Sequence, residues 1–397
     1  MHVFVPKELF PGETRVPILP GTAAKLVAKG AEVTIESGLG QTLGIPDSSY
    51  LEQGAQVSSD RHDQLDRADL VFRLRKPPSA DLESLREGGI QVGLLDPFNE
   101  RELVERLAAA SVTAVSLEMI PRITAAQKMD ALSSQANLAG YVAVVLAANA
   151  MNRILPLMMT AAGTIKPVRL LVIGVGVAGL QAIATARRLG ATVEAFDTRP
   201  AVEEQVKSLG ARFIKLDLGE TGQTAGGYAK ELTAAQLQKQ RELLAAEVAE
   251  VDVVITAAQV FGRRAPIVVT TEMVRRMRPG SVVVDTAVDT GGNVECSQRD
   301  AIANVGGVKV VGWTNLPGRV AANASEMYSN NLAAFFDHVW DTKNGVVRMD
   351  LEDEILRGCV ITHGGIVCHE IIQRVYAERA TAAASQTDLS TKTLVSK

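Results

Sequence analysis

The chain has 397 residues and a formal net charge of −4, and 47% of its residues are hydrophobic but only 4% are aromatic. This length exceeds what one ordinary core organises, so it predicts two domains of about 150 to 200 residues each. The low aromatic content favours an α/β protein over an all-β sandwich, and the weakly acidic charge gives no electrostatic reason to expect a nucleic-acid partner.

The cysteines and the apolar runs indicate the cellular compartment of the protein. Cys296, Cys359 and Cys368 form no CxxC pair and no disulfide framework, which indicates a reducing compartment. The first seven residues lack the basic and apolar regions of a signal peptide. The longest apolar helical pattern, at residues 138–151, is shorter than the roughly 18 residues of a membrane span. We therefore expect a soluble chain in which this pattern forms a buried helix.

Apolar runs and helical patterns alternate in the first third of the chain. They predict strands at residues 3–5, 32–35, 70–74, 90–95 and 113–117, and helices at 22–29, around 82–86 and at 100–110. Thr22 is the expected cap of the first helix, and Gly30 its expected stop. Such alternation predicts a parallel sheet covered by helices on both faces. The charged segment at 12–16 is either a binding loop or an ordinary solvated turn.

A polar stretch at residues 118–130 precedes a long Ala- and Gly-rich helical pattern that begins near Met129 and runs to Met151. This arrangement predicts a loop that leads into a helix connecting two domains. Ser133, Ser134 and Asn137 on this helix are either solvated or line a cleft.

The most informative motif is G-x-G-x-x-G at Gly174, Gly176 and Gly179. An apolar strand pattern at 170–173 precedes it, and a helical pattern at 181–189 and a second strand pattern at 192–196 follow. The first glycine permits the tight turn, the second lets the backbone approach a pyrophosphate, and the third lets the helix pack against the strand. The amides at the helix N-terminus then face the phosphates. The motif predicts a dinucleotide site, and the alternative is a glycine turn that binds no nucleotide.

The second strand pattern ends at Asp197, 18 residues after Gly179. A carboxylate about 20 residues beyond the glycines accepts hydrogen bonds from a ribose 2′-hydroxyl and repels a 2′-phosphate, so Asp197 predicts NAD(H) rather than NADP(H). Arg199 lies close enough to accommodate such a phosphate, but the position of Asp197 at the strand end favours NAD(H).

The remaining patterns continue the α/β alternation. Residues 224–228 combine glycines with Tyr228 and predict either a mobile lid, an oligomerisation hairpin or a plain connection. Helices are expected at 234–249, 273–277 and 324–342, and strands at 253–256, 282–285, 309–312, 359–362 and 366–368. The last of these helices is expected to cross back to the first domain.

Two features lie near the C-terminus. Cys359, His363, Cys368 and His369 match no zinc spacing, so we expect buried cysteines and a surface histidine in a hairpin rather than a metal site. Residues 380–397 are small, polar and patternless, which predicts a disordered tail beginning at about residue 381.

From Pro6 to about His369 the chain resembles the NAD(H)-binding alpha subunit, or domain I, of proton-translocating NAD(P) transhydrogenases. The resemblance is most specific at residues 118–141, 158–164, 174–180 and 224–230. It implies that Arg122, Gln127 and Asp130 contact the nicotinamide end of NADH and that Tyr228 belongs to a mobile loop that closes over the nucleotide. The other cofactor-binding residues that it implies are Ser133, Gly174, Val175, Gly176, Val177, Ala178, Gly179, Asp197, Thr198, Arg199, Gly227, Gln240, Ala258 and Gln259.

The resemblance also implies an architecture and partners. We expect two Rossmann-like, doubly wound parallel-sheet domains joined by long helices, with the nucleotide in the cleft between them. The first domain comprises residues 1–125 and 326–380, and the NAD(H)-binding domain residues 126–325. The implied assembly is a cytoplasmic homodimer, without metal, that docks on an NADP(H)-binding subunit and on membrane-spanning chains that conduct protons.

Two alternatives remain open. Alanine dehydrogenase resembles the chain at Arg15, at residues 75–77 and at 315–319, but it needs a lysine and a histidine where this chain has Arg75 and Asp96. Without that histidine, oxidative deamination lacks its general base, whereas direct hydride transfer between two nicotinamide rings requires none. The other alternative is a regulator that binds NADH and catalyses nothing.

Overall fold

The computed structural model describes residues 1–219, 221–223 and 230–381. These residues form two compact units. Unit 1 comprises Met1–Leu132 and the chain from Ala321 onward, and unit 2 comprises Ser133–Val320. Helix α5 (Ala131–Ala150) begins with the last two residues of the first segment of unit 1 and otherwise belongs to unit 2.

Unit 1 is built on an eight-stranded sheet with the order β19-β18-β6-β5-β4-β1-β2-β3. Its strands are β1 (His2–Val5), β2 (Glu32–Glu36), β3 (Gln56–Ser58), β4 (Leu70–Arg75), β5 (Ile90–Leu94), β6 (Thr113–Ser116), β18 (Val360–His363) and β19 (Ile366–Val367). The six strands from β3 to β6 are parallel, and β18 and β19 add an antiparallel edge. The order 3-2-1-4-5-6 is the doubly wound order, whose ligand crevice lies between β1 and β4.

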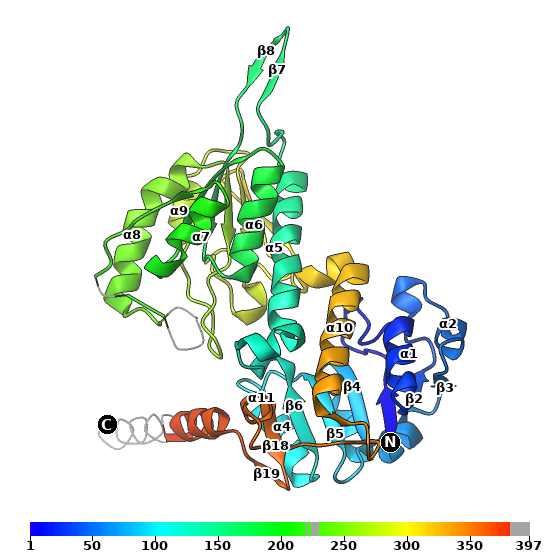
Figure 1. Ribbon diagram of the computed structural model, residues 1–397. Helices are drawn as coiled ribbons and strands as arrows, with labels where there is room; N and C mark the ends of the chain where they lie inside the picture. Colours follow the sequence, from blue (N-terminus) through cyan, green and yellow to red (C-terminus); the bar gives the residue numbers. More distant parts are fainter. Residues whose placement is uncertain (220, 224–229, 382–397) are drawn as a thin grey trace, which may run out of the picture. The chain divides into compact units, whose positions relative to one another are not determined.

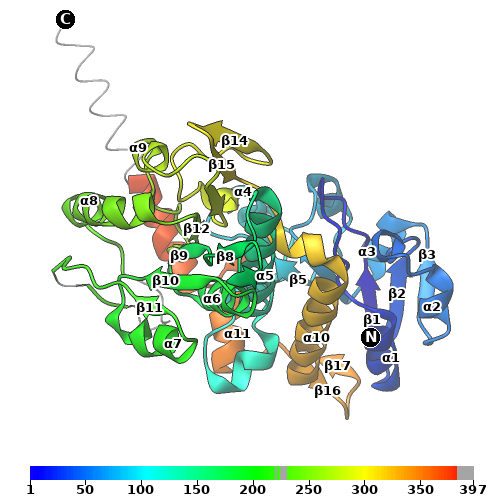
Figure 2. The ribbon, with the colours of Figure 1, turned by 90° about the horizontal axis from the view of Figure 1, so that it is seen from above.

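The helices of unit 1 cover this sheet. They include α1 (Pro20–Ala28), α2 (Asp47–Leu51), α3 (Arg61–Arg67), α4 (Arg101–Ala109), α10 (Ala321–Val339) and α11 (Glu354–Cys359), with 3₁₀ turns η1 (Gln41–Leu43), η2 (Ser79–Ser84), η3 (Leu117–Met119) and η4 (Thr124–Met129). A small hairpin, β16 (Trp340–Asp341) and β17 (Val346–Val347), follows α10. Figures 1 and 2 show α1 and α10 side by side. Tyr328 of α10 is fully buried and donates a hydrogen bond to the carbonyl of Arg73 in β4.

Unit 2 contains a second sheet of the same kind, with the order β11-β10-β9-β12-β13-β15-β14. Its strands are β9 (Arg169–Ile173), β10 (Thr192–Phe196), β11 (Arg212–Phe213), β12 (Val253–Thr256), β13 (Val282–Asp285), β14 (Ile302–Val305) and β15 (Val308–Val311). All neighbouring pairs are parallel except β14 with β15. The helices that follow α5 are α6 (Val177–Arg188), α7 (Glu203–Ser208), α8 (Ala234–Glu250) and α9 (Thr271–Arg275), with 3₁₀ turns η5 (Pro200–Val202), η6 (Val288–Thr290) and η7 (Leu316–Val320). Strands β7 (Met158–Thr160) and β8 (Gly163–Ile165) form a separate hairpin.

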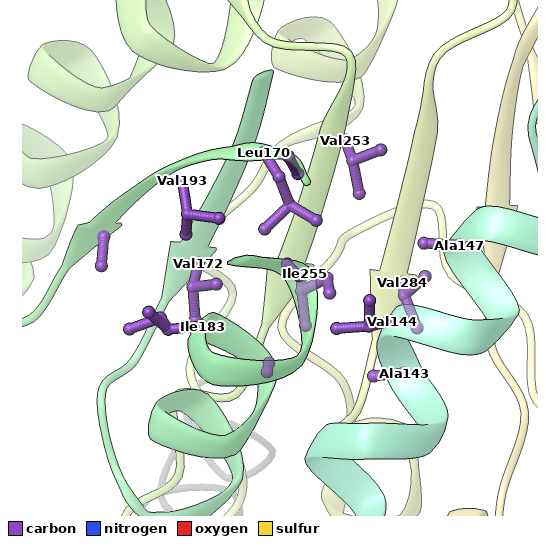
Figure 3. Packing of buried hydrophobic residues seen from close by; sticks show 14 of the residues in the cluster. Ala143, Val144, Ala147, Leu170, Val172, Ile183, Val193, Val253, Ile255 and Val284 are labelled. Atoms are coloured by element: carbon purple, nitrogen blue, oxygen red, sulfur yellow. The ribbon is translucent and has the colours of Figure 1, made fainter. Parts of the chain in front are cut away.

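Alternate residues of β9 enter different cores, which explains its continuous apolar run. Leu170 and Val172 pack with α5 and α6, whereas Leu171 and Ile173 pack with α8 and α9. Figure 3 shows Val144 and Ala147 of α5 facing the sheet near Val284 and Ile255, and Ile183 of α6 beside Val172. A strand buried on both faces is typical of a doubly wound parallel sheet. The predicted fold class, two Rossmann-like parallel-sheet domains, is confirmed.

Helix α5 is both long and apolar. Among the described residues it is the single helix whose length and hydropathy would suffice to cross a membrane. Val142, Ala143, Val144 and Ala147 nevertheless belong to the core of unit 2. Gly140 lies so close to the main chain of α6 that a Cβ atom there would be 2.1 Å from the carbonyl oxygen of Ala178. The small residues of α5 therefore serve close packing against α6.

Several predicted elements differ from the observed ones. Helix α1 begins at Pro20 rather than at Thr22, whose buried hydroxyl instead accepts a hydrogen bond from Ser329. The helix predicted around residues 82–86 is the 3₁₀ turn η2, and Cys359 ends α11 instead of starting a strand. Residues 370–381 are helical, so the tail predicted to begin at about residue 381 does not include Thr381, and its remainder lies outside the described residues.

Candidate nucleotide-binding site

The three glycines of the motif have three different surroundings in unit 2. Gly174 follows β9 with φ +96°, and a Cβ atom there would lie 2.6 Å from the carbonyl carbon and oxygen of Ala257. A Cβ atom on Gly179 would lie 2.0 Å from the carbonyl oxygen of Gly174. Gly176 differs, because its Cβ atom would meet no protein atom within 4 Å. Gly174 and Gly179 are therefore required by the fold itself, and Gly176 leaves room for a ligand.

Helix α6 starts directly after this turn, with Gly176 as its N-cap and no side chain capping it. Val177, Ala178 and Gly179 form its first turn, four residues before the predicted helix. The amides and the positive dipole end of an uncapped helix attract a phosphate. The open surface at Gly176 and the N-terminus of α6 thus fit a pyrophosphate.

Asp197 lies immediately beyond β10, next to the glycine turn. Its Oδ2 accepts a hydrogen bond of 2.7 Å from the amide of Val175, and both carboxylate oxygens accept hydrogen bonds from Arg199. The hydrogen bonds to Asp197 raise the pKa of Arg199 further above its usual value, although burial opposes this. Thr198, half-buried, connects the two charged residues. The carboxylate predicted to bind the ribose is therefore hydrogen-bonded to the turn predicted to bind the pyrophosphate.

The loop after β12 completes this edge of the sheet. Ala258 and Gln259 are half-buried and exposed, respectively, and the Ala257–Ala258 peptide lies against Gly174. Because β9 and β12 are neighbours and their carboxyl ends lie at the same edge, this is the topological switch point of unit 2, where doubly wound folds bind ligands.

The sequence analysis missed the residues that hold this loop. The buried side chain of Asn293 accepts a hydrogen bond of 3.0 Å from the amide of Ala258 and donates bonds of 2.8 Å to the carbonyls of Ala258 and Pro266. The backbone amide of Asn293 in turn donates a hydrogen bond to the carboxylate of Asp285, which is fully buried at the end of β13. The adjacent glycines, Gly291 and Gly292, both have positive φ and were the available signal.

We expect Asn293→Asp to destabilise unit 2 and to weaken NADH binding. The carboxylate cannot donate to the carbonyls of Ala258 and Pro266 and lies near the charge of Asp285, which costs about 3 kcal/mol or more. Thermal unfolding and NADH titration measure the two effects.

The matched control is Asn304→Asp, because Asn304 is exposed on the edge strand β14 and its side-chain oxygen accepts a hydrogen bond from the amide of Gly307, which a carboxylate also accepts. This control should behave like the unmodified protein. Equal melting temperatures for the two variants would contradict the role of Asn293.

The residues predicted to contact nicotinamide lie on or beside η4 in unit 1. Arg122 is exposed and Asp130 is half-buried, and in η4 (Thr124–Met129) each of the two buried residues follows two exposed ones. The turn is fixed by the buried side chains of Ala126 and Met129 and by Asn331 of α10, whose amide donates a hydrogen bond of 2.8 Å to the carbonyl of Lys128. Gln127 is exposed, and its side chain thus projects from a well-anchored backbone.

The other predicted residues have varied positions. Ser133 is half-buried on α5, and Gln240 is buried on α8, on the same helical face as Leu244 and Val248 of the core. Gly227 and Tyr228 lie outside the described residues.

The carboxyl edge of the sheet in unit 1 bears on the dehydrogenase alternative. Arg15 donates hydrogen bonds of 2.8 and 2.7 Å to Glu13, and Arg75 donates a third of 2.7 Å. Burial would raise the pKa of Glu13, but the two arginines outweigh it and lower this pKa to about 2. At the end of β5, Asp96 has φ +52°, and burial raises its pKa. Both arginines are therefore paired with an internal carboxylate, and an aspartate occupies the position of the expected histidine.

The cysteines and histidines near the C-terminus are packed separately. Cys359 is buried, and His363 contacts the hydroxyl of Thr113 at 3.0 Å. His369 is buried and its Nε2 contacts the carbonyl of Gly358 at 3.1 Å. Within residues 1–219, 221–223 and 230–381, no group of three or more His, Cys, Asp or Glu side chains could hold a metal.

Comparison with known proteins gives a consistent result. Residues 4–139 match the family model described as "Alanine dehydrogenase/PNT, N-terminal domain", and residues 143–370 match that described as "Alanine dehydrogenase/PNT, C-terminal domain". The chain is 45% identical to an NAD(P) transhydrogenase subunit alpha chain of Rhodospirillum rubrum, over 93% of this chain and 98% of that protein.

Two further comparisons show that the chain is more similar in sequence to a transhydrogenase than to an alanine dehydrogenase. The crystal structure of transhydrogenase from Sinorhizobium meliloti is similar with a TM-score of 0.82 and 43% identity, covering 92% of this chain and 100% of that one. Alanine dehydrogenase of Bacillus subtilis is 27% identical, over 94% of each chain.

Proposed function

The chain belongs to the alanine dehydrogenase/PNT family, among the NAD(P) transhydrogenase alpha subunits, and we propose that it binds NAD(H) in unit 2 and exchanges a hydride directly with NADP(H) on a partner subunit. The observation that carries the choice of NAD(H) is Asp197, whose carboxylate lies beside the turn at Gly174–Gly179 and reaches the amide of Val175. A carboxylate at this position favours a ribose 2′-hydroxyl over a 2′-phosphate.

The residues present fit a dinucleotide. Gly176 leaves space where a side chain would block a pyrophosphate, and the uncapped start of α6 provides amides for it. The nicotinamide ring supplies the hydride chemistry when the nucleotide is bound. The chain contributes by binding the adenosine half through Asp197 and the glycine turn, and by orienting the nicotinamide end through Arg122, Gln127 and Asp130.

In this mechanism the catalytic contribution of the chain is positioning. Direct transfer between two rings requires the donor and acceptor carbons to approach to about 3 to 3.5 Å in a defined orientation. It also requires water to be excluded, because the reacting rings must not meet competing proton donors. No side chain has to give or take a proton in this step, which agrees with an aspartate rather than a histidine at position 96. The proposed activity is the Re/Si-specific, proton-translocating transhydrogenase reaction.

The proposed assembly is a homodimer. The hairpin formed by β7 (Met158–Thr160) and β8 (Gly163–Ile165) projects from unit 2 beyond its helices (Figure 1), and all six strand residues are exposed. Met159 is 74% exposed. Apolar side chains on a protruding two-stranded hairpin gain stability when another surface covers them, and a second copy related by a two-fold axis is the commonest such partner.

The name "subunit alpha" of the relatives implies further subunits in those proteins. We propose that this chain likewise works in the cytoplasm with an NADP(H)-binding subunit and with membrane-spanning chains that conduct protons. It would then associate with the inner membrane peripherally, through these partners.

The purified chain is expected to catalyse hydride transfer from NADH to an NADP⁺ analogue when the partner subunit is added. It is not expected to reduce NAD⁺ with L-alanine, nor to oxidise NADH with pyruvate and ammonia, because Arg75 and Asp96 replace the lysine and the histidine of the dehydrogenase and because Glu13 pairs with both Arg15 and Arg75. Absorbance of NADH at steady state measures all three reactions.

The outcomes separate the three functions. Steady turnover with alanine or pyruvate would favour the dehydrogenase. NADH binding without transfer to the partner's nucleotide would favour a regulator. Transfer in the first assay alone supports the transhydrogenase.

A further inference from the structure

The carboxylate of Asp197 uses its full capacity for hydrogen bonds within the chain. Oδ1 accepts from the amide of Arg199 at 2.8 Å and from its Nε at 2.9 Å. Oδ2 accepts from the amide of Val175 at 2.7 Å and from Nη2 of Arg199 at 2.8 Å. An ionised carboxylate offers about four acceptor sites. A ribose hydroxyl can therefore bind Asp197 only by replacing one of these four donors.

The four donors are not equally replaceable. The amides of Val175 and Arg199 belong to the backbone beside the glycine turn. The guanidinium of Arg199 is the terminus of a long side chain, and it also donates a 2.9 Å hydrogen bond from Nη2 to the carbonyl of Val175. The ribose and the guanidinium consequently compete for the same carboxylate oxygens.

The pair also sets the local charge. The side chains of Asp197 and Arg199 are 6% and 13% exposed, respectively, so water screens their charges only weakly. A guanidinium bound in bidentate geometry neutralises the carboxylate, and the same hydrogen bonds prevent it from binding another anion. A phosphate on the ribose 2′-oxygen would be recognised well by a guanidinium, but only by one that the carboxylate does not hold.

We propose that Arg199 is a specificity-determining residue of the nucleotide site, and that Asp197 selects against a 2′-phosphate by sequestering Arg199 as well as by its own charge. This inference rests on the proposed NAD(H) function. When the carboxylate is present, Arg199 is bound to it and NADH is preferred. When the carboxylate is removed, Arg199 is released and becomes a ligand for the 2′-phosphate of NADPH.

The test is a double-mutant cycle on the full chain with Asp197→Ala, Arg199→Ala and the double variant. Each protein is titrated with NADH and NADPH by nucleotide fluorescence at low and at high ionic strength. Arg188→Ala is the matched control, because Arg188 lies exposed in the last turn of α6 and its loss makes the same change of charge. A double variant with Asp197→Ala and Arg199→Lys keeps the charge but loses the bidentate geometry.

Asp197→Ala is expected to invert the preference, with NADPH gaining about tenfold to a hundredfold relative to NADH, since a charged hydrogen bond to phosphate is formed where one to ribose is lost. Removing Arg199 from this variant should abolish the gain, and lysine should restore part of it. The gain should shrink at high salt. Arg199→Ala alone should bind NADH at least as selectively as the unmodified chain, because the carboxylate is then unneutralised.

A purely structural role of Arg199 predicts a different pattern, in which Asp197→Ala and the double variant bind both nucleotides equally weakly. That result, or an NADPH affinity unaffected by removing Arg199 from the Asp197→Ala variant, would overturn the inference while NADH binding by the unmodified chain still stood. If the unmodified chain bound neither nucleotide, the proposed function itself would fail. Melting temperatures of all variants identify any that do not fold.

Discussion

Alanine in place of Gly179 is expected to abolish NADH binding and to destabilise unit 2 substantially. The new Cβ atom would lie 2.0 Å from the carbonyl oxygen and 3.0 Å from the carbonyl carbon of Gly174. Both are main-chain atoms of the tight turn, so α6 must move away from β9 to relieve the overlap. Such overpacking costs about 1–3 kcal/mol, and more where backbone blocks the relief. Thermal unfolding and NADH titration measure the two consequences.

The matched control is Gly176→Ala in the same turn. Its Cβ atom would contact no protein atom within 4 Å, and its φ of −87° suits any residue. This variant should melt within about 2 °C of the unmodified protein, since its expected change in stability is below about 0.5 kcal/mol. It should nevertheless bind NADH much more weakly, because the methyl group occupies the approach of the pyrophosphate. NADH binding unaffected in both variants would contradict the location of the site.

The substitution Gln127→Asn is expected to slow hydride transfer about a hundredfold, since an error of about 1 Å in placing a reacting group has an effect of this size. The shorter side chain would withdraw its amide from the nicotinamide end that we propose it orients, while η4 remains anchored through Ala126, Met129 and Asn331. The affinity for NADH should fall much less, because in the proposed site the glycine turn and Asp197 provide most of the binding. Stopped-flow transfer to an NADP⁺ analogue on the partner subunit, with equilibrium titration of NADH, separates the two effects.

Lys128→Gln provides the comparison, because the side chain of Lys128 is exposed on the same turn and its carbonyl, which Asn331 binds, is retained. This variant should transfer hydride at the normal rate. If Gln127→Asn abolished binding but left the rate for bound nucleotide intact, or if it changed neither, the proposed roles of Gln127, Arg122 and Asp130 would all be withdrawn.

The parts of the fold that the sequence predicted well are those with a strong local signal. Strands β10, β12 and β13 have the predicted bounds, because short apolar runs between turn residues leave little choice. Helix α6 begins four residues before its predicted start, because its first turn consists of the motif glycine and small residues that carry no helical pattern. The elements α2, β3 and α3 were missed because they are short and largely polar, and β14 because it is an antiparallel edge strand.

The site shows the same division between local and distant information. The glycine turn and Asp197 lie within one βαβ segment, so their spacing could be read directly. The hydrogen bond between Asn293 and Ala258 joins residues 35 positions apart in the sequence, and that from Arg75 to Glu13 joins residues 62 positions apart. Neither contact has a periodic signal, and both depend on which strands become neighbours. The pairing of Arg199 with Asp197 is local, but a sequence cannot tell whether a guanidinium binds its neighbour or a ligand.

The pairing of β18 with β6 has a consequence for synthesis on the ribosome. Ala114 of β6 and Thr362 of β18 are joined by a hydrogen bond across 248 residues of chain. At roughly 5–20 residues per second, β18 follows β6 after on the order of 10 to 50 s. Unit 2, which is a continuous segment, emerges completely within that interval and can finish its own sheet first. The nascent chain therefore carries a folded unit 2 while β6 is still an open edge, and such an edge is available to strands of other chains until the C-terminal residues arrive.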